Sequence, residues 1–194
     1  MSTLKIEERF ELDAHADEAW AYLTQPKRIV VCLPGAELTE VIDERNYAGG
    51  VKVKLGAVAM EYQGTIEFTE LDHEKRVIRM EGKGRERRGG GTVSLTMENT
   101  VRELEGGRCE VTVLADIQLA GKIIRFGRGM IQAVTAEIFK QFTVCLAAEL
   151  AAGEPVSEGP VAEEPAGSSS EALSLFPLLR RTLRSWLRRL FGRE

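Results

Sequence analysis

The chain has 194 residues, which suits one domain of ordinary size with accessory segments. A hydrophobic content of 43% permits a packed core, and a net charge of −4 argues against binding of nucleic acid by the chain as a whole. The charge is unevenly spread, because residues 1–150 carry 20 Lys+Arg and 24 Asp+Glu, 151–172 carry none and 5, and 173–194 carry 6 and 1. We therefore expect a domain over 1–150, an acidic linker over 151–172 and a basic segment over 173–194.

The beginning of the chain, MSTLKIEERFEL, lacks the apolar core of a signal peptide, so we expect no secretory leader. No apolar run approaches the ~20 residues that a membrane-spanning helix needs. The cysteines at positions 32, 109 and 145 are widely spaced and match neither a disulfide framework nor a CxxC metal site. They are predicted to be buried thiols in a reducing cytoplasm.

The first elements alternate in type. Residues 4–12 alternate apolar and polar side chains, as in a half-buried strand. Asp13 to Asp17 supplies capping chemistry for a helix in ADEAWAYLTQ (16–25). Pro26 restarts the chain into a second short helix, KRIVVCL (27–33), which Pro34-Gly35 ends.

From residue 37 to 119 the hydrophobic period is two, which predicts strands near 37–43, 46–55, 58–70, 76–87, 91–103 and 108–119. Short turns between them predict an antiparallel meander. From 121 to about 150 the period becomes 3.6, which predicts one long helix. The fold class is therefore α+β: a curved antiparallel sheet of about seven strands around a long C-terminal helix, with two short helices.

Side-chain parity identifies the residues that would face the long helix. They include Val53, Leu55, Met60, Tyr62, Ile66, Met80 and Leu95. A solid core accounts for any one of these residues taken alone. The layout of sheet and helix, together with adaptable methionines and glycines at inward positions, favours an internal apolar cavity.

Catalytic and metal-binding patterns are sparse. His15 and His73 lie in polar, turn-like contexts, where surface histidines are the expected interpretation, and no HExxH or GxSxG pattern occurs. The stretch GKGRERRGGG (82–91) suggests a phosphate-binding loop, but a strand pattern follows it instead of a helix. It is interpreted as an exposed hairpin tip or as an electrostatic contact with an acidic partner or lipid headgroups.

The last 22 residues, LSLFPLLRRTLRSWLRRLFGRE, have the pattern of an amphipathic helix. Residues 151–172 are acidic and lack aromatic side chains, so they are predicted to be a disordered tether. Cations opposite an apolar stripe favour a helix lying in the membrane interface, whereas docking on a partner protein or on its own domain are the alternatives. The stripe contains Phe176, Leu179, Leu183, Trp186, Leu187 and Leu190, and the opposite face contains Arg180, Arg181, Arg184 and Arg188.

Three stretches together resemble a known family: VCLPGAELTEV (31–41), GGVKVKLGAVAMEYQGTIEFTELD (49–72) and LAGKIIRFGRGMIQAVTAEIFKQFTVCL (119–146). They resemble the CoxG family of carbon-monoxide-dehydrogenase subunits over about residues 3–150. That family belongs to the helix-grip superfamily, which includes START and Bet v 1-like (SRPBCC) domains. Ala57 departs from the family pattern, where proline follows the glycine; this concerns the local turn.

The resemblance implies a non-catalytic accessory protein with a deep apolar cavity and no covalently bound cofactor. Its implied partner is a molybdenum-containing CO dehydrogenase or a related molybdenum hydroxylase, and its implied ligand is a respiratory quinone (menaquinone or ubiquinone) or a similar lipid. With the basic tail, this predicts a cytoplasmic protein held peripherally on the anionic inner leaflet of the cell membrane. A recruitment adaptor without a ligand and a helix-grip enzyme are the alternatives.

Combining the resemblance with parity gives a predicted ligand site. Leu33, at the end of the second short helix, is placed near its mouth, in an element that can act as a lid. The predicted walls are Val53, Leu55, Met60, Tyr62 and Met80 from the sheet, and Ile124, Met130, Ile131 and Val134 from the long helix.

Overall fold

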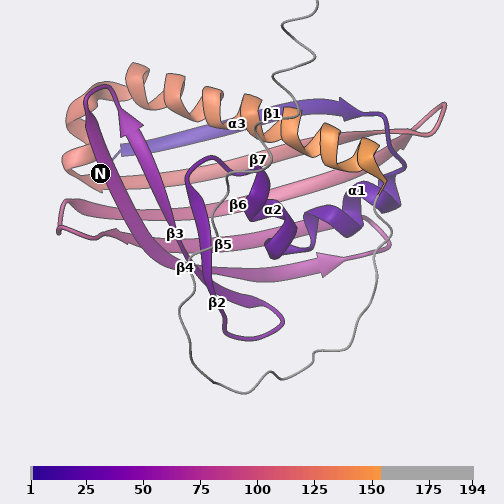
Figure 1. Cartoon of the computed structure of the whole chain (residues 1–194), viewed down its shortest axis with the longest axis horizontal. Helices are drawn as coiled ribbons and strands as arrows, with labels where there is room; N and C mark the ends of the chain where they lie inside the picture. Colours follow the sequence, from indigo (N-terminus) through magenta and orange to yellow (C-terminus); the bar gives the residue numbers. More distant parts are fainter. Residues whose placement is uncertain (1, 154–194) are drawn as a thin grey trace, which may run out of the picture. The chain divides into compact units, whose positions relative to one another are not determined.

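The computed structural model describes residues 2–153 and consists of one antiparallel sheet with helices on one of its faces (Figure 1). Its order along the chain is β1 (Ser2–Leu12), α1 (Ala16–Leu23), α2 (Pro26–Cys32), β2 (Ala36–Val41), β3 (Asn46–Leu55), β4 (Val58–Asp72), β5 (Val77–Glu86), β6 (Gly91–Leu104), β7 (Arg108–Gly121), the 3-10 helix η1 (Lys122–Phe126) and α3 (Gly127–Ala152).

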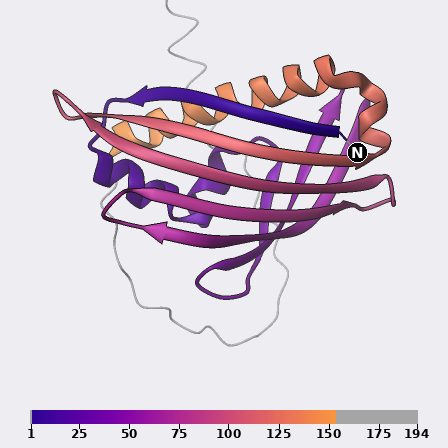
Figure 2. The same cartoon turned by 180° about the vertical axis from the view of Figure 1, so that it is seen from behind.

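The sheet has seven strands in the order β1-β7-β6-β5-β4-β3-β2, so the predicted meander is confirmed and β1 joins it beside β7. Seen from behind, the sheet lies in front of the helices (Figure 2). The long helix α3 therefore runs along the inner face of a curved sheet, as the hydrophobic periods predict. The predicted tail helix and most of the predicted linker lie outside the described residues.

The long helix begins later than predicted. Hydrophobic period alone indicates a helix from residue 121, but the α-helix starts at Gly127, whose φ of 77° is left-handed. The five residues before it form η1, which has three residues per turn instead of 3.6. Side chains of η1 are therefore out of phase with those of α3.

A row of glycines permits the bend of the sheet. Gly49, Gly64 and Gly84 lie opposite one another on β3, β4 and β5. A Cβ atom on Gly64 would lie 1.9 Å from the carbonyl oxygen of Lys83, and one on Gly49 would lie 2.5 Å from that of Glu37. The backbones approach too closely for any side chain, so glycine is required where the sheet curves towards α3.

The buried side chains form two separate clusters. The first cluster joins α1, α2 and the second half of α3 to the sheet and includes Trp20, Tyr22, Phe68, Ile78, Met80, Val111 and Leu146. The second cluster joins η1 and the first half of α3 to the sheet and contains Leu4, Leu55, Met60, Tyr62, Leu119, Ile123 and Ile131.

The expectation of three free thiols is wrong for two cysteines. Cys32 at the end of α2 and Cys145 on α3 form a disulfide, with their Cα atoms 5.3 Å apart. They are separated by 113 residues, so no local spacing pattern reveals the pair. Cys109 is buried and free, as predicted, and burial raises the pKa of its thiol to about 11.

Candidate ligand-binding site

The middle of the inner sheet face has its own set of apolar residues. Register places Ile66 on β4 opposite Gly82 on β5, and Gly82 opposite Leu95 on β6. A Cβ atom on Gly82 would lie 3.5 Å from Leu95 and 3.6 Å from Ile66, so the three residues share one face. Gly82 is buried and contributes no side chain between its two neighbours.

This middle region is not packed like the two clusters. Ile66 is 40% exposed, although Tyr62 and Phe68, on the same face of β4, are buried. Leu95 is half-buried, and neither Ile66 nor Leu95 belongs to either cluster. An inward-facing apolar side chain that stays accessible to water indicates unfilled space, since a packed interior would bury it.

The facing side of α3 is also incompletely packed. Of its 26 residues, Ile131 and Leu146 are buried, one in each cluster. Ile138 lies between them along the helix, is half-buried and belongs to neither cluster. We call Ile66, Gly82, Leu95 and Ile138 the apolar belt; it lies between the clusters and forms the candidate site.

Tyr62 provides a polar group at one side of the belt. Its side chain is 4% exposed, and its hydroxyl has no hydrogen-bond partner among the described residues. Burial, and then the nearby Glu86 carboxylate, raise the pKa of Tyr62, so the hydroxyl keeps its proton. A buried hydroxyl without a partner is costly, and a ligand oxygen would satisfy it.

Glu86 and Asn99 are further polar groups on the inner face, and the predicted site omitted both. Glu86 lies opposite Tyr62 and accepts hydrogen bonds from the backbone N–H groups of Arg88 (2.9 Å) and Gly90 (2.7 Å). Asn99 is 6% exposed, and its Oδ1 has no partner within residues 2–153. The alternation of side chains along each strand could have identified both residues, since Glu86 and Asn99 point to the same face as the inward apolar residues of β5 and β6.

The structure brings together six of the predicted site residues. Val53, Leu55, Met60, Tyr62, Ile131 and Val134 lie in the second cluster or pack against it. Met80 lies in the first cluster, and Leu33 is half-buried at the end of α2. Ile124 is 39% exposed, because η1 changes the phase of the first part of the predicted helix, and Met130, which precedes the buried Ile131 on α3, is 43% exposed.

Two pockets lie away from the belt. One, of about 420 Å³, lies over β4 to β7, and its lining includes the polar or basic side chains of Gln63, Lys83, Arg85 and Gln118. The other, of about 380 Å³, lies between the β5–β6 turn and η1. Within residues 2–153, no helix combines the length and apolar character needed to cross a bilayer.

Comparisons with known proteins agree with this architecture. A family model for CoxG, described as a subunit of carbon monoxide dehydrogenase, matches residues 9–151. No curated protein sequence matches the chain. A conserved protein from Geobacillus kaustophilus has a similar structure, with a TM-score of 0.70, 22% identity, and coverage of 77% of this chain and 96% of that one.

Two more distant structures share the fold. A START superfamily protein from Mycobacterium smegmatis has a TM-score of 0.53 at 10% identity, covering 76% of this chain and 97% of that one. The Zhui aromatase/cyclase from a Streptomyces species has a TM-score of 0.59 at 16% identity, covering 82% of this chain and all of that one. These likenesses establish a START-like, helix-grip fold, which hosts enzymes as well as other proteins.

Proposed function

The chain belongs to the CoxG family of carbon monoxide dehydrogenase subunits, and from that premise we propose that it carries a respiratory quinone or similar lipid for CO dehydrogenase or a related molybdenum hydroxylase. Membership implies association with CO dehydrogenase. The carried ligand, the related enzymes and the place of action at the membrane are our proposal.

The observation that carries the proposal is the apolar belt. Ile66, Leu95 and Ile138 face the space between sheet and α3, remain accessible to water and lie outside both packed clusters. An isoprenoid chain is insoluble in water and gains free energy, about 0.8 kcal/mol per buried CH₂ group, when it enters such a site. Ligand pockets are typically apolar with a few polar groups that orient the ligand.

Tyr62 is the candidate for orienting the quinone headgroup. Its buried hydroxyl is protonated and lacks a partner within the described residues, so it can donate a hydrogen bond to a quinone carbonyl. The protein holds the quinone while CO dehydrogenase reduces it, and we assign no catalytic residue to this chain.

Membrane attachment is assigned to residues 173–194. The apolar stripe around Leu183 and Trp186 would enter the interface, and each arginine near an anionic leaflet adds about 1 kcal/mol of binding free energy. The acidic linker would be repelled by the same leaflet and would leave the domain free to reach both membrane and enzyme.

Lipid extraction tests carriage directly. The full chain, purified gently from cells that make quinones, is analysed by native mass spectrometry and by solvent extraction. A bound quinone or isoprenoid lipid in a stoichiometric amount is expected. Purified protein that contains no lipid, and that does not take up added quinone, would contradict carriage and leave the adaptor role.

A further inference from the structure

One end of the domain concentrates basic residues that are distant in sequence. In an antiparallel meander the β3–β4 and β5–β6 turns and the end of β7 lie at the same end of the sheet, at the left in Figure 1. GKGRERRGGG (82–91) and GKIIRFGRGM (121–130) meet there, because Gly91 pairs with Gly121 and the N–H of Lys122 donates to the carbonyl of Gly90 (2.6 Å).

These two segments hold seven of the twenty Lys and Arg residues of 1–150 and one carboxylate, Glu86. Glu86 is buried and bonded to backbone N–H groups, so it shows little charge to the outside. The result is a positive surface on a domain whose net charge is negative. Four of the seven, Arg88, Lys122, Arg125 and Arg128, together with Lys54 at the end of β3, define what we call the basic end.

Apolar side chains are exposed among these cations. Val58 is 46% exposed, Met130 43% and Ile124 39%. The pocket of about 380 Å³ also lies here, lined by the backbone of Gly89, Gly90, Gly91 and Gly121 and by Lys122, Ile124 and Arg125. Backbone close to two cations suits the phosphate of a lipid headgroup, and the apolar side chains suit the boundary beneath it.

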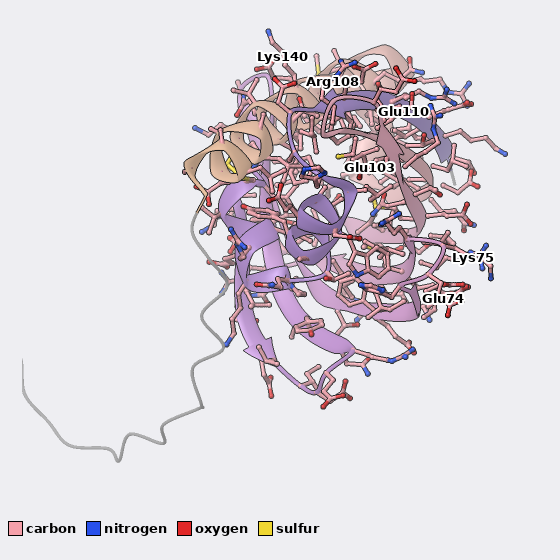
Figure 3. All side chains as sticks on the ribbon, turned by 90° about the vertical axis from the view of Figure 1, so that its right-hand side faces the viewer. Glu74, Lys75, Glu103, Arg108, Glu110 and Lys140 are labelled. Atoms are coloured by element: carbon pink, nitrogen blue, oxygen red, sulfur yellow. A yellow bond between two sulfur atoms is a disulfide. The ribbon has the colours of Figure 1, made fainter. Side chains whose placement is uncertain are left out.

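The opposite end of the domain has a different character. Figure 3 looks onto that end, where Glu74, Lys75, Glu103, Arg108 and Glu110 are mixed. Its cations form ion pairs with carboxylates: Lys75 with Asp72, Arg76 with Asp17, Arg102 with Glu110 and Arg108 with Glu11. Near the basic end, Glu61 pairs with Lys52 and Arg87, but Lys54, Arg88, Lys122 and Arg125 form no ion pair within residues 2–153. The basic end thus gathers four cations without an ion pair close together, whereas unpaired cations such as Lys27 and Arg45 lie singly elsewhere.

We propose that the basic end docks the folded domain on an anionic phospholipid bilayer, as a second contact separate from the tail. The proposal rests on the proposed function, because a carrier must bring its domain to the membrane to take up a quinone. An acidic protein surface would also attract the cations. The exposed Val58, Ile124 and Met130 favour lipid, because they can enter the acyl boundary while the cations meet the headgroups.

The test uses the full chain with its tail inactivated by Leu183→Glu and Trp186→Glu. Into this background we introduce Lys122→Glu with Arg125→Glu, or the matched control Lys27→Glu with Arg45→Glu. Both control residues are exposed, form no ion pair within the described residues and lie away from the basic end, and the two pairs change the net charge equally. Each protein is sedimented with vesicles of phosphatidylcholine alone or mixed with phosphatidylglycerol, at low and at raised salt.

The tail-inactivated chain is expected to bind the phosphatidylglycerol vesicles weakly at low salt and to be released as salt rises. Loss of two cations at about 1 kcal/mol each corresponds to at least ~30-fold weaker partition for Lys122→Glu/Arg125→Glu. The control should stay within a few-fold of its parent. Thermal melting of each variant checks that the fold is retained.

Equal losses in both charge-reversal pairs would overturn the proposal, because net charge alone would then explain binding. Absence of vesicle binding in the tail-inactivated parent would overturn it too. The exposed cations would then be better explained by binding to an acidic protein surface. Quinone uptake in detergent separates this proposal from the carrier function. A chain that takes up quinone but does not bind vesicles would contradict membrane docking by the basic end alone. A chain that binds vesicles but takes up no quinone would contradict the carrier function and support the docking proposal.

Discussion

Tyr62 places a hydroxyl among apolar side chains with no partner in the described part of the chain. Neighbouring inward residues on β4, Met60 and Phe68, contribute only packing. A protein ordinarily satisfies a buried hydroxyl, because leaving it unpaired costs about 1–3 kcal/mol. In our proposal, a bound ligand completes the hydrogen bond of this hydroxyl.

Tyr62→Phe should leave the free energy of unfolding unchanged or raise it by up to about 2 kcal/mol, since an unpaired buried group is removed. Quinone affinity should fall about 5-fold, the value of one neutral hydrogen bond of about 1 kcal/mol. Chemical denaturation and quinone titration measure the two effects. Tyr47→Phe is the control, because that hydroxyl donates to the carbonyl of Glu44 (2.8 Å). A destabilised Tyr62→Phe with unchanged affinity would assign the hydroxyl a structural role.

At the scale of elements, the packing of α2 on α3 depends on a covalent link. Cys32 is buried at the end of α2 and is bonded to Cys145 in the second half of α3. The Tyr22 hydroxyl, on α1, lies 3.4 Å from the Cys32 sulfur and donates a hydrogen bond to the carbonyl of Arg28 on α2. These two interactions join α1 to the contact between α2 and α3. The disulfide thus fixes the short helices over one end of the space beneath α3.

Reduction of the disulfide, or Cys32→Ser, should lower the free energy of unfolding by about 2–5 kcal/mol, because the closed loop is long. Urea denaturation with and without a reductant measures the loss. The variant should show no further loss when reductant is added, which separates the disulfide from any effect of serine in a buried position. A parent protein equally stable in both conditions would contradict this role.

Element-level features differ in how well the sequence predicts them. Strand positions and the meander follow from period-two runs separated by short turns. Parity places Leu55, Met60 and Tyr62 on the inner face of the sheet, and all three lie in the second cluster. Parity predicts which face of a strand a side chain occupies, but not which cluster it packs into along that strand. Met80 therefore has the predicted face but lies in the first cluster. The start of α3 depends on one left-handed glycine, Gly127, and the disulfide depends on tertiary contact, so neither follows from local pattern.

For the molecule as a whole, we propose that membrane binding would rest on two unequal contacts. The tail supplies several large apolar side chains as well as cations, whereas the basic end of the domain supplies mainly cations with three exposed apolar residues. Hydrophobic burial persists at high salt, but attraction between exposed charges is screened. The tail should therefore dominate at physiological ionic strength.

Deletion of 173–194, or Leu183→Glu with Trp186→Glu, should move the protein from the membrane fraction to the supernatant at physiological salt. The physical reason is loss of the apolar stripe, which the domain cannot replace. Co-sedimentation with phosphatidylglycerol-containing vesicles measures it, and Leu173→Glu, outside the stripe, serves as the matched substitution. A truncated chain that sediments as well as the full chain would show that the tail is not the anchor.

The central claim is that the apolar belt holds the quinone, and filling the belt tests it most directly. Ile138→Trp adds volume at a half-buried position outside both clusters, whereas Val144→Trp adds it on the outer face of α3, where Val144 is 66% exposed. Quinone binding and thermal melting are measured together in the full chain. We predict that Ile138→Trp loses quinone binding and melts within a few degrees of its parent, and that Val144→Trp changes neither. A solid core would be overpacked and lose ~1–3 kcal/mol, so an Ile138→Trp protein that is strongly destabilised, or that still binds quinone as its parent does, would contradict the account.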